Sequence, residues 1–163
     1  MTEKDYNLCV KNYSDGVLRF VNRSILSTED AKDILQDSLI KLWANIQNVS
    51  VEKSKSFLFT TAHNLMINKL KAKKVRQDFQ TSQQKETPIA QANNTKYEQK
   101  DLILYAVNQL PLNQKECLLL KDWEGFSIEE IAACLKITSS NVKVNIFRAR
   151  IKIRELIDKE TRR

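Results

Sequence analysis

The sequence predicts an all-α protein made of two small helical domains joined by a flexible linker. Apolar residues recur at helical spacing along most of the 163 residues, whereas the alternating pattern of a half-buried strand does not recur. The chain contains only two glycines and two prolines, which is low for a β-rich or loop-rich fold. A polar stretch rich in glutamine and asparagine separates the two helical halves, and this stretch predicts the linker.

The first domain, residues 1–76, is predicted to contain three helices. The first covers about residues 5–24, and the second follows a cluster of capping residues at 27–30 and continues to about residue 47. The third helix covers about residues 54–74 and ends in a run of lysines. The second and third helices are expected to pack through Ala31, Leu35, Leu39, Leu42, Trp43, Ile46, Phe57, Ala62, Leu65 and Ile67, which places Trp43 in the core.

The predicted linker covers residues 77–96. It is dominated by glutamine, asparagine and threonine, and it contains Pro88. Its few apolar side chains cannot offset the entropy lost on ordering, so we expect a flexible tether. Helical periodicity resumes near Tyr97, and residues 97–163 are therefore assigned to a second domain.

The second domain is predicted to contain four helices. One covers about residues 102–110, and another starts at 111–113 and carries the apolar run 117–120. The third begins at Ser127, where Glu130 stands at the spacing of a capping box. Residues 136–138 form a turn, after which Ser139 or Ser140 is expected to cap the last helix.

The last predicted helix is strongly basic. Two capped helices joined by a short turn, the second of them basic, are typical of a helix-turn-helix that places one helix in the DNA major groove. A solvated face of an ordinary packing helix, or a helix lying on a membrane surface, would show the same charge pattern. The order of cap, helix, turn, cap and helix favours DNA binding over these two alternatives. Between Ser139 and Arg154 the basic residues are Lys143, Arg148, Arg150, Lys152 and Arg154, with no acidic residue among them.

Overall composition narrows the classes of partner and site. The net charge of +7 and a pI of about 9.3 favour an acidic partner, nucleic acid first and anionic lipid second. No apolar run is long enough to cross a bilayer, and the charged N-terminus lacks a signal-peptide core, so we expect a cytoplasmic protein without membrane insertion.

The cysteines and the single histidine do not form the pattern of a reactive site. Cys9, Cys117 and Cys134 are widely spaced and His63 stands alone, which leaves too few ligands for zinc. Nothing near these cysteines indicates an activated thiol, and Cys117 and Cys134 lie in helical contexts typical of small buried side chains. We expect His63 to be a neutral surface or core residue. These residues therefore predict no metal site and no bound cofactor.

Several motifs together resemble one known family. In the first half these are residues 30–37 followed by Trp43, and residues 56–65 with their Ala-His-Asn-Leu core. In the second half they are residues 109–111, 126–132 and 147–150. In this order and spacing the motifs resemble the extracytoplasmic-function group of bacterial sigma factors, the dissociable promoter-recognition subunits of RNA polymerase. The two domains would then be sigma regions 2 and 4.

The resemblance implies an initiation factor that binds core RNA polymerase and promoter DNA and is itself held inactive by an anti-sigma factor. It also implies that the protein is not an enzyme and has no small-molecule substrate. It assigns Asp33, Gln36 and Asp37 to docking on the polymerase. The third helix, with residues 48–55 before it, would bind the minus-ten element through Asn64 and the cations Lys69, Lys71, Lys73 and Lys74. Region 4 would bind the minus-thirty-five element through Ser127, Ser139, Asn141, Lys143, Val144, Phe147, Arg148 and Arg150, with Lys143, Phe147 and Arg148 the best candidates for base contact.

Two other interpretations remain open at this point. A stand-alone helix-turn-helix regulator would explain the second half, although the extra domain of such a regulator usually senses a ligand or dimerises. A helical adaptor that binds only proteins would be expected to show a less uniformly basic surface along residues 143–154.

Overall fold

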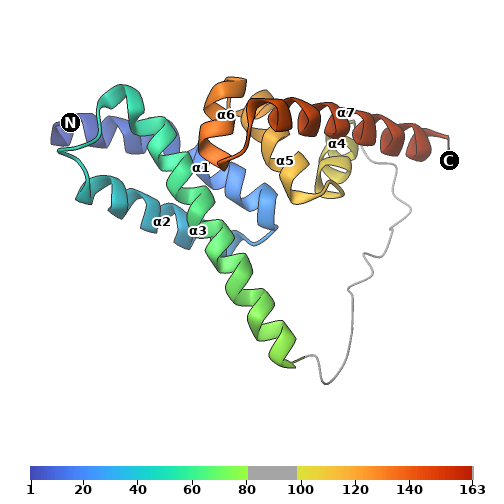
Figure 1. The fold of residues 1–163 in the computed structure, drawn as a ribbon, viewed down its shortest axis with the longest axis horizontal. Coiled ribbons are helices and arrows are strands. Elements are labelled where there is room, and N and C mark those ends of the chain that lie inside the picture. Colours follow the sequence, from blue (N-terminus) through green and yellow to red (C-terminus); the bar gives the residue numbers. More distant parts are fainter. Residues whose placement is uncertain (81–98, 163) are drawn as a thin grey trace.

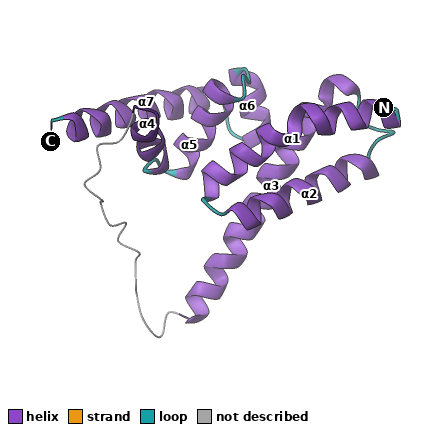
Figure 2. Cartoon of the chain, turned by 180° about the vertical axis from the view of Figure 1, so that it is seen from behind, coloured by secondary structure: helices purple, strands orange, loops and turns teal. Residues whose placement is uncertain are grey.

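A computed structural model describes residues 1–80 and 99–162, and residues 81–96 of the predicted linker lie outside the described part. Within those two ranges the chain forms α-helices, one short π-helix and no strand, which confirms the all-α prediction (Figures 1 and 2). The helices are α1 (Glu3–Ile25), α2 (Thr28–Ala44), α3 (Val51–Gln80), α4 (Gln99–Asn108), α5 (Leu112–Leu118), the π-helix η1 (Leu119–Trp123), α6 (Ile128–Leu135) and α7 (Ser139–Thr161).

The first three helices pack on one another and form an N-terminal unit, α1–α3. The buried face of α2 consists of Ala31, Ile34, Ser38 and Leu42, which are spaced by three or four residues. Trp43 lies about 100° further round the helix than Leu42, and 48% of it is exposed. The prediction that Trp43 lies in the core is therefore wrong; its ring instead packs edge-on against Tyr6, with 4.9 Å between ring centres.

Helix α3 is longer than the sequence predicted. It begins at Val51 and continues to Gln80, so residues 77–80, which we assigned to the linker, are helical. All residues from 71 to 80 are exposed, and Figure 1 shows this end of the helix extending away from the other helices. Neither glycine nor proline interrupts residues 51–80, and helix-favouring lysine, arginine, alanine and glutamine sustain the helix without tertiary support.

The remaining helices form a C-terminal unit, α4–α7. Its core includes Cys117, Leu118, Leu119 and Leu120. Helix α7 packs against α5, and its buried residues are Val142, Ile146 and Ala149. Helix α6 has the predicted capping box, in which Ser127 and Glu130 exchange hydrogen bonds of 3.1 Å with each other's backbone N–H groups.

The cap of α7 differs from the prediction. Thr138, and not Ser139 or Ser140, is the N-cap, and its hydroxyl accepts a hydrogen bond from the Asn141 N–H at 3.1 Å. Lys136 has a left-handed backbone with φ of 57°, which ends α6 and turns the chain early enough for Thr138 to reach the capping position.

The two units also pack against each other, which the sequence did not predict. Helix α3 contacts α6, and α1 contacts α5. Three phenylalanines join the units at this contact: the ring centres of Phe20 and Phe59 are 5.8 Å apart, and those of Phe59 and Phe126 are 5.0 Å apart. All three rings are buried, so one continuous apolar core connects the N-terminal and C-terminal units.

Candidate nucleic-acid interface

The exposed face of α7 carries the side chains predicted to read DNA. Lys143, Val144, Phe147 and Arg148 are exposed, on the side of the helix away from its buried residues. Phe147 is 66% exposed, so it does not pack in the core and remains available to a partner. Lys143 and Arg148 form no ion pair within residues 1–80 and 99–162. The face therefore combines two cations, an aromatic ring and an aliphatic side chain on a supported helix.

The start of α7 adds backbone donors to this face. Asn141 is exposed and Ser139 is half-buried in the first turn, where free N–H groups favour an anion such as phosphate. Ser127, which we predicted to contact DNA, is half-buried, and its hydroxyl accepts a hydrogen bond in the cap of α6. This capping role is sufficient to explain a serine at position 127. Arg150 is exposed but pairs with Asp122 at 3.0 Å, which reduces the charge that it presents to DNA.

The cations of α3 fall into two pairs. Lys69 lies 3.6 Å from Asp30 and 3.5 Å from Asp33, and Lys73 donates a hydrogen bond to Asp30. That hydrogen bond from Lys73 is the main reason why the pKa of Asp30 is lowered from its ordinary value. Lys71 and Lys74, by contrast, are exposed and form no ion pair within the described ranges.

The polar face of α2 is open to a partner. Asp33, Gln36 and Asp37 are all exposed and lie together on one side of the helix because they are three or four residues apart. Ile40, 63% exposed, extends the same side by one turn, with Trp43 beyond it. Sequence reasoning missed these two apolar residues as surface groups, although the spacing of Ile40 from Gln36 is the signal that could have placed it there.

Asn64 is half-buried and stands next to His63, which is buried. The His63 Nδ1 lies 2.8 Å from the Glu116 Oε1 in a buried hydrogen bond between α3 and α5. His63 is therefore a core residue and is not free to contact a base.

The three cysteines are all free and buried, which confirms the expectation for Cys117 and Cys134 and adds Cys9. Burial raises the pKa of Cys117 to about 12 and that of Cys134 to about 11, so both thiols remain protonated near neutral pH. In the described part of the chain, no three histidine, cysteine, aspartate or glutamate side chains are grouped to hold a metal ion. None of the described helices has both the length and the apolar composition that crossing a bilayer requires.

Comparison with known families matches both units. A model of sigma-70 region 2 matches residues 9–76, and a model of sigma-70 region 4 matches residues 100–153. The chain belongs to the sigma-70 family. The first match spans α1, α2 and most of α3, and the second spans α4 to the middle of α7.

Similar proteins place this sigma factor in the extracytoplasmic-function group. It is 26% identical over 147 residues to the RNA polymerase sigma-E factor of Streptomyces coelicolor, which covers 90% of the chain and 82% of that relative. It is 24% identical over 159 residues to the ECF RNA polymerase sigma factor SigM of Bacillus subtilis, with 90% of the chain and 91% of SigM covered.

Two solved structures share the fold. The sigma factor RpoE of Bartonella quintana, solved with the anti-sigma factor NepR, aligns with a TM-score of 0.79 and 22% identity over 95% of this chain and 98% of that one. CnrH, solved with the cytosolic domain of CnrY, aligns with a TM-score of 0.68 and 18% identity over 97% of this chain and 90% of that one. At these identities the likeness is one of fold.

The sigma factor thus directs transcription initiation by core RNA polymerase at specific promoters, the role of its family. Members of this family are initiation factors and not enzymes. A stand-alone helix-turn-helix regulator is not favoured, because both sigma regions are present in one chain.

Proposed function

We propose that the α1–α3 unit docks on core RNA polymerase and binds the minus-ten element, while the α4–α7 unit binds the minus-thirty-five element. The observation that best supports this division is the exposed set Lys143, Phe147 and Arg148 on α7, a helix whose opposite face is buried and whose start is capped. A helix supported in this way can enter the major groove with its side chains in a defined register.

On α7, different side chains would do different work. Lys143 and Arg148 carry long cationic donors that match the acceptors of guanine, and Phe147 can contact a thymine methyl group. Val144 adds an apolar contact beside them, while Ser139 and Asn141 lie where the helix start favours phosphate. Arg150, partly neutralised by Asp122, would contribute mainly long-range attraction to the DNA backbone.

On α3, Asn64 would donate and accept hydrogen bonds at the edge of an unpaired base, and nearby cations would hold the phosphates of the single strand. We assign the larger phosphate role to Lys71 and Lys74, because both are exposed and unpaired within the described residues. Lys69 and Lys73 would contribute less, since binding phosphate requires them to give up Asp30 and Asp33.

On α2, the carboxylates of Asp33 and Asp37 and the amide of Gln36 would contact polar groups of the polymerase. The exposed side chains of Ile40 and Trp43 would add apolar area to the same contact. Aromatic residues are frequent at the centres of protein interfaces, which fits a docking role for Trp43 better than a purely structural one.

An anti-sigma factor is a further proposed partner. The structure of the Bartonella quintana relative was solved with the anti-sigma factor NepR bound. We also propose that the protein acts in the cytoplasm, where core polymerase and promoter DNA are found.

Initiation measured with purified components tests the proposed function. The protein is mixed with core polymerase and a pool of promoter fragments, and transcripts are sequenced. We expect transcripts from a subset of fragments only when protein and core are both present. Tight duplex binding by the protein alone, with no association with core, would support a regulator instead, and the absence of any DNA dependence would support an adaptor.

Asp37→Lys tests the polymerase-docking face separately. We expect it to weaken binding to core polymerase while leaving binding of the free protein to a minus-thirty-five duplex unchanged. Asp158→Lys is the matched control, because Asp158 is also exposed but lies at the far end of α7. Equal affinity of both variants for core would remove Asp37 from the docking face.

A further inference from the structure

A pocket with a volume of about 520 Å³ lies between α1 and α4. Side chains of α1 and its C-cap Leu26 line one side, and Leu104 and Asn108 of α4 line the other. No residue that we assign to DNA or to core polymerase lines it. We propose that this pocket binds a nucleotide, meaning a nucleoside that carries at least one phosphate group. The site is separate from the proposed function and does not depend on it.

Arg23, in the last turn of α1, lacks the partner that a half-buried guanidinium requires. Its side chain lines the pocket. The Nε atom is buried without a hydrogen-bond partner in the described part of the chain, and Arg23 forms no ion pair there. Buried polar groups in folded proteins are nearly always hydrogen-bonded, because an unsatisfied donor loses its hydration without compensation. An acceptor bound in the pocket would provide that compensation for Arg23.

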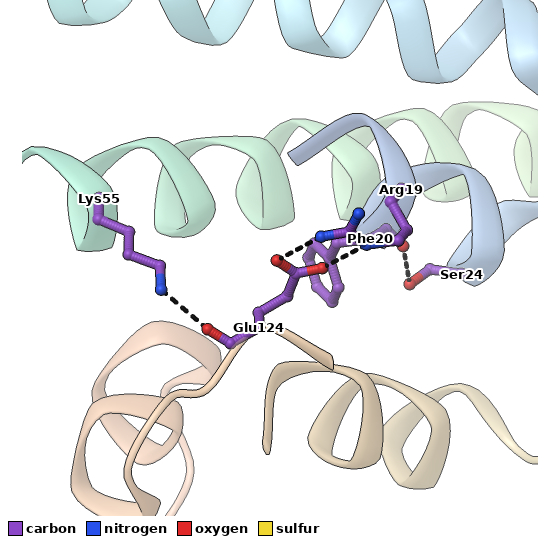
Figure 3. Close-up of polar contacts among 5 residues, drawn as sticks. All are labelled: Arg19, Phe20, Ser24, Lys55 and Glu124. Carbon is purple, nitrogen blue, oxygen red and sulfur yellow. Dashed lines mark hydrogen bonds and ion pairs between the residues drawn. The ribbon is translucent and has the colours of Figure 1, made fainter. Parts of the chain in front are cut away.

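A second guanidinium, that of Arg19, lines the same wall one turn before Arg23. Arg19 donates from Nε and Nη2 to the Glu124 carboxylate, at 2.9 and 3.2 Å (Figure 3). A guanidinium carries five N–H donors, so these two bonds leave three donors of Arg19 available. Residues four apart lie on one face of a helix. The two arginines therefore present several donors together, which suits the three oxygens of a phosphate group.

One acidic residue, Asp15, also lines the pocket. The hydrogen bond to Glu124 is the main reason why the pKa of Arg19 is raised, and the nearby charge of Asp15 adds to it. Glu124 and Asp15 thus act on Arg19 and leave Arg23 as the uncompensated cation. Because Asp15 is exposed, water and salt screen its repulsion of a bound anion. Removing the Asp15 charge should still favour the anion, so the sign of its effect is fixed.

Three leucines give the pocket apolar walls against which a base can pack. Leu18 and Leu104 are half-buried, whereas Leu26 is 60% exposed. Leu26 has a left-handed backbone with φ of 55°, a conformation that is uncommon outside glycine. This turn ends α1 and leaves the Leu26 side chain on the wall of the pocket. Apolar walls favour a ligand with a flat apolar body over a phosphate ion alone.

Two amide side chains complete the lining, and they suit the edge of a base. Asn22 of α1 and Asn108 of α4 each carry donors and an acceptor in one planar group, as the edge of a base does. Small-molecule sites have volumes of roughly 300–1,000 Å³, so this pocket has room for a nucleoside beside its phosphate. Arginines for the phosphate, leucines for the base faces and amides for the base edge together favour a nucleotide.

Isothermal titration calorimetry of the full-length protein tests the site. The probes are AMP, GMP, adenosine, inorganic phosphate and a short single-stranded oligonucleotide. We expect AMP or GMP to bind with a Kd about tenfold or more below those of adenosine and inorganic phosphate, because only a nucleotide engages both the arginines and the apolar walls. Nucleotide binding no tighter than that of inorganic phosphate would overturn the proposal.

The oligonucleotide separates two sources of the same chemistry. If it displaces the bound mononucleotide, the pocket takes a nucleotide within a nucleic-acid strand; if it does not, the pocket takes a free nucleotide. Arg23→Ala should weaken nucleotide binding by about tenfold or more, and Arg23→Lys should recover only part of it, because lysine lacks the guanidinium fork. Arg162→Ala removes an equal charge from an exposed site at the end of α7 and is the control. Equal losses in Arg23→Ala and Arg162→Ala would reduce binding to general attraction and overturn the site.

Two exposed positions test the site without disturbing the half-buried Arg23. Asp15→Asn should tighten nucleotide binding by about twofold or more, since it removes the repulsion of the phosphate, and a folding defect would not produce a gain. Asn108→Leu should weaken binding of AMP or GMP while leaving that of inorganic phosphate unchanged, because the amide faces the base. Circular dichroism checks that each variant is folded. Unchanged nucleotide affinity in both folded variants would show that the ligand does not occupy this pocket.

Discussion

Helices α3 and α7 both carry runs of cations, but the fold supports them differently. The reading face of α7 is backed by the buried residues Val142, Ile146 and Ala149 and is oriented by the Thr138 cap. The cations of α3 lie near an end of the helix whose residues 71–80 are exposed on every side. A base-reading surface needs defined register, whereas a surface that follows flexible single-stranded phosphates needs mainly charge. The packing behind α7 therefore fits its proposed role in base reading, and the exposed end of α3 fits its proposed role in binding single-strand phosphates.

The two surfaces also differ in how far their charge is neutralised within the protein. Two of the four proposed α3 cations are paired with acidic residues of α2, while Lys143 and Arg148 on α7 form no ion pair in the described part of the chain. The comparison predicts sequence-dependent losses from changes on α7 and salt-dependent, sequence-independent losses from changes on α3.

The largest effect is expected on α7. Arg148→Ala should weaken binding to a minus-thirty-five duplex by about 1–3 kcal/mol and relax the preference at one base pair, because a bidentate contact with guanine is lost. Affinities for a set of single-base duplex variants measure this. Lys152→Ala is the control and should weaken all duplexes alike. A preserved base preference in Arg148→Ala would remove this residue from the reading role.

A smaller effect, of a different kind, is expected on α3. Replacing Lys71 and Lys74 together by alanine should lower affinity for every single-stranded sequence and reduce the slope of log K against log salt by about 1.4, or 0.7 per phosphate. Replacing Lys69 and Lys73 instead should change the slope less, since these cations are already paired. Titrations at several salt concentrations distinguish the two variants, and equal slopes would contradict the division of the cations into pairs.

The support of α7 can be weakened without touching its cations. Thr138→Ala should lower the free energy of unfolding by about 1 kcal/mol, because the Asn141 N–H loses its cap. Ser139→Ala should have a much smaller effect on stability. Urea unfolding measures the free energy of unfolding of both variants. A larger decrease for Ser139→Ala than for Thr138→Ala would show that Ser139 is the N-cap, as the sequence suggested.

The smallest effect concerns the acidic residues that pair with α3. Because its folded pKa is lowered, Asp30 contributes stability that is present above its unfolded pKa of 3.8 and is lost as pH falls through the folded value. Asp30→Asn should therefore flatten the loss of stability in acid, with a change at neutral pH below about 1 kcal/mol. It should also free Lys73 and slightly tighten single-strand binding. Unfolding curves between pH 2 and 7 measure the first effect, and an unchanged acid profile would rule out this pairing.

Local features were predictable from the sequence because they depend on neighbouring residues. The helical periodicity, the basic last helix and the capping box of Ser127 and Glu130 each lie within a few turns of one helix. The cap of α7 was misassigned among Thr138, Ser139 and Ser140, because three adjacent hydroxyl residues look alike in sequence. The left-handed conformation of Lys136 decides which of them reaches the capping position.

The sequence by itself determined the all-α class, the helix-turn-helix and the positions of Lys143, Phe147 and Arg148 away from the apolar stripe of the last helix. Only the tertiary structure decided that Trp43 is exposed, that Lys69 and Lys73 are paired, and that Arg19 meets Glu124 105 residues away. Helical periodicity shows which face of a helix is apolar, but it does not show which helix covers that face. Contacts between distant residues leave no periodic signal, so the pairing of the two units emerges only when the helices are packed together.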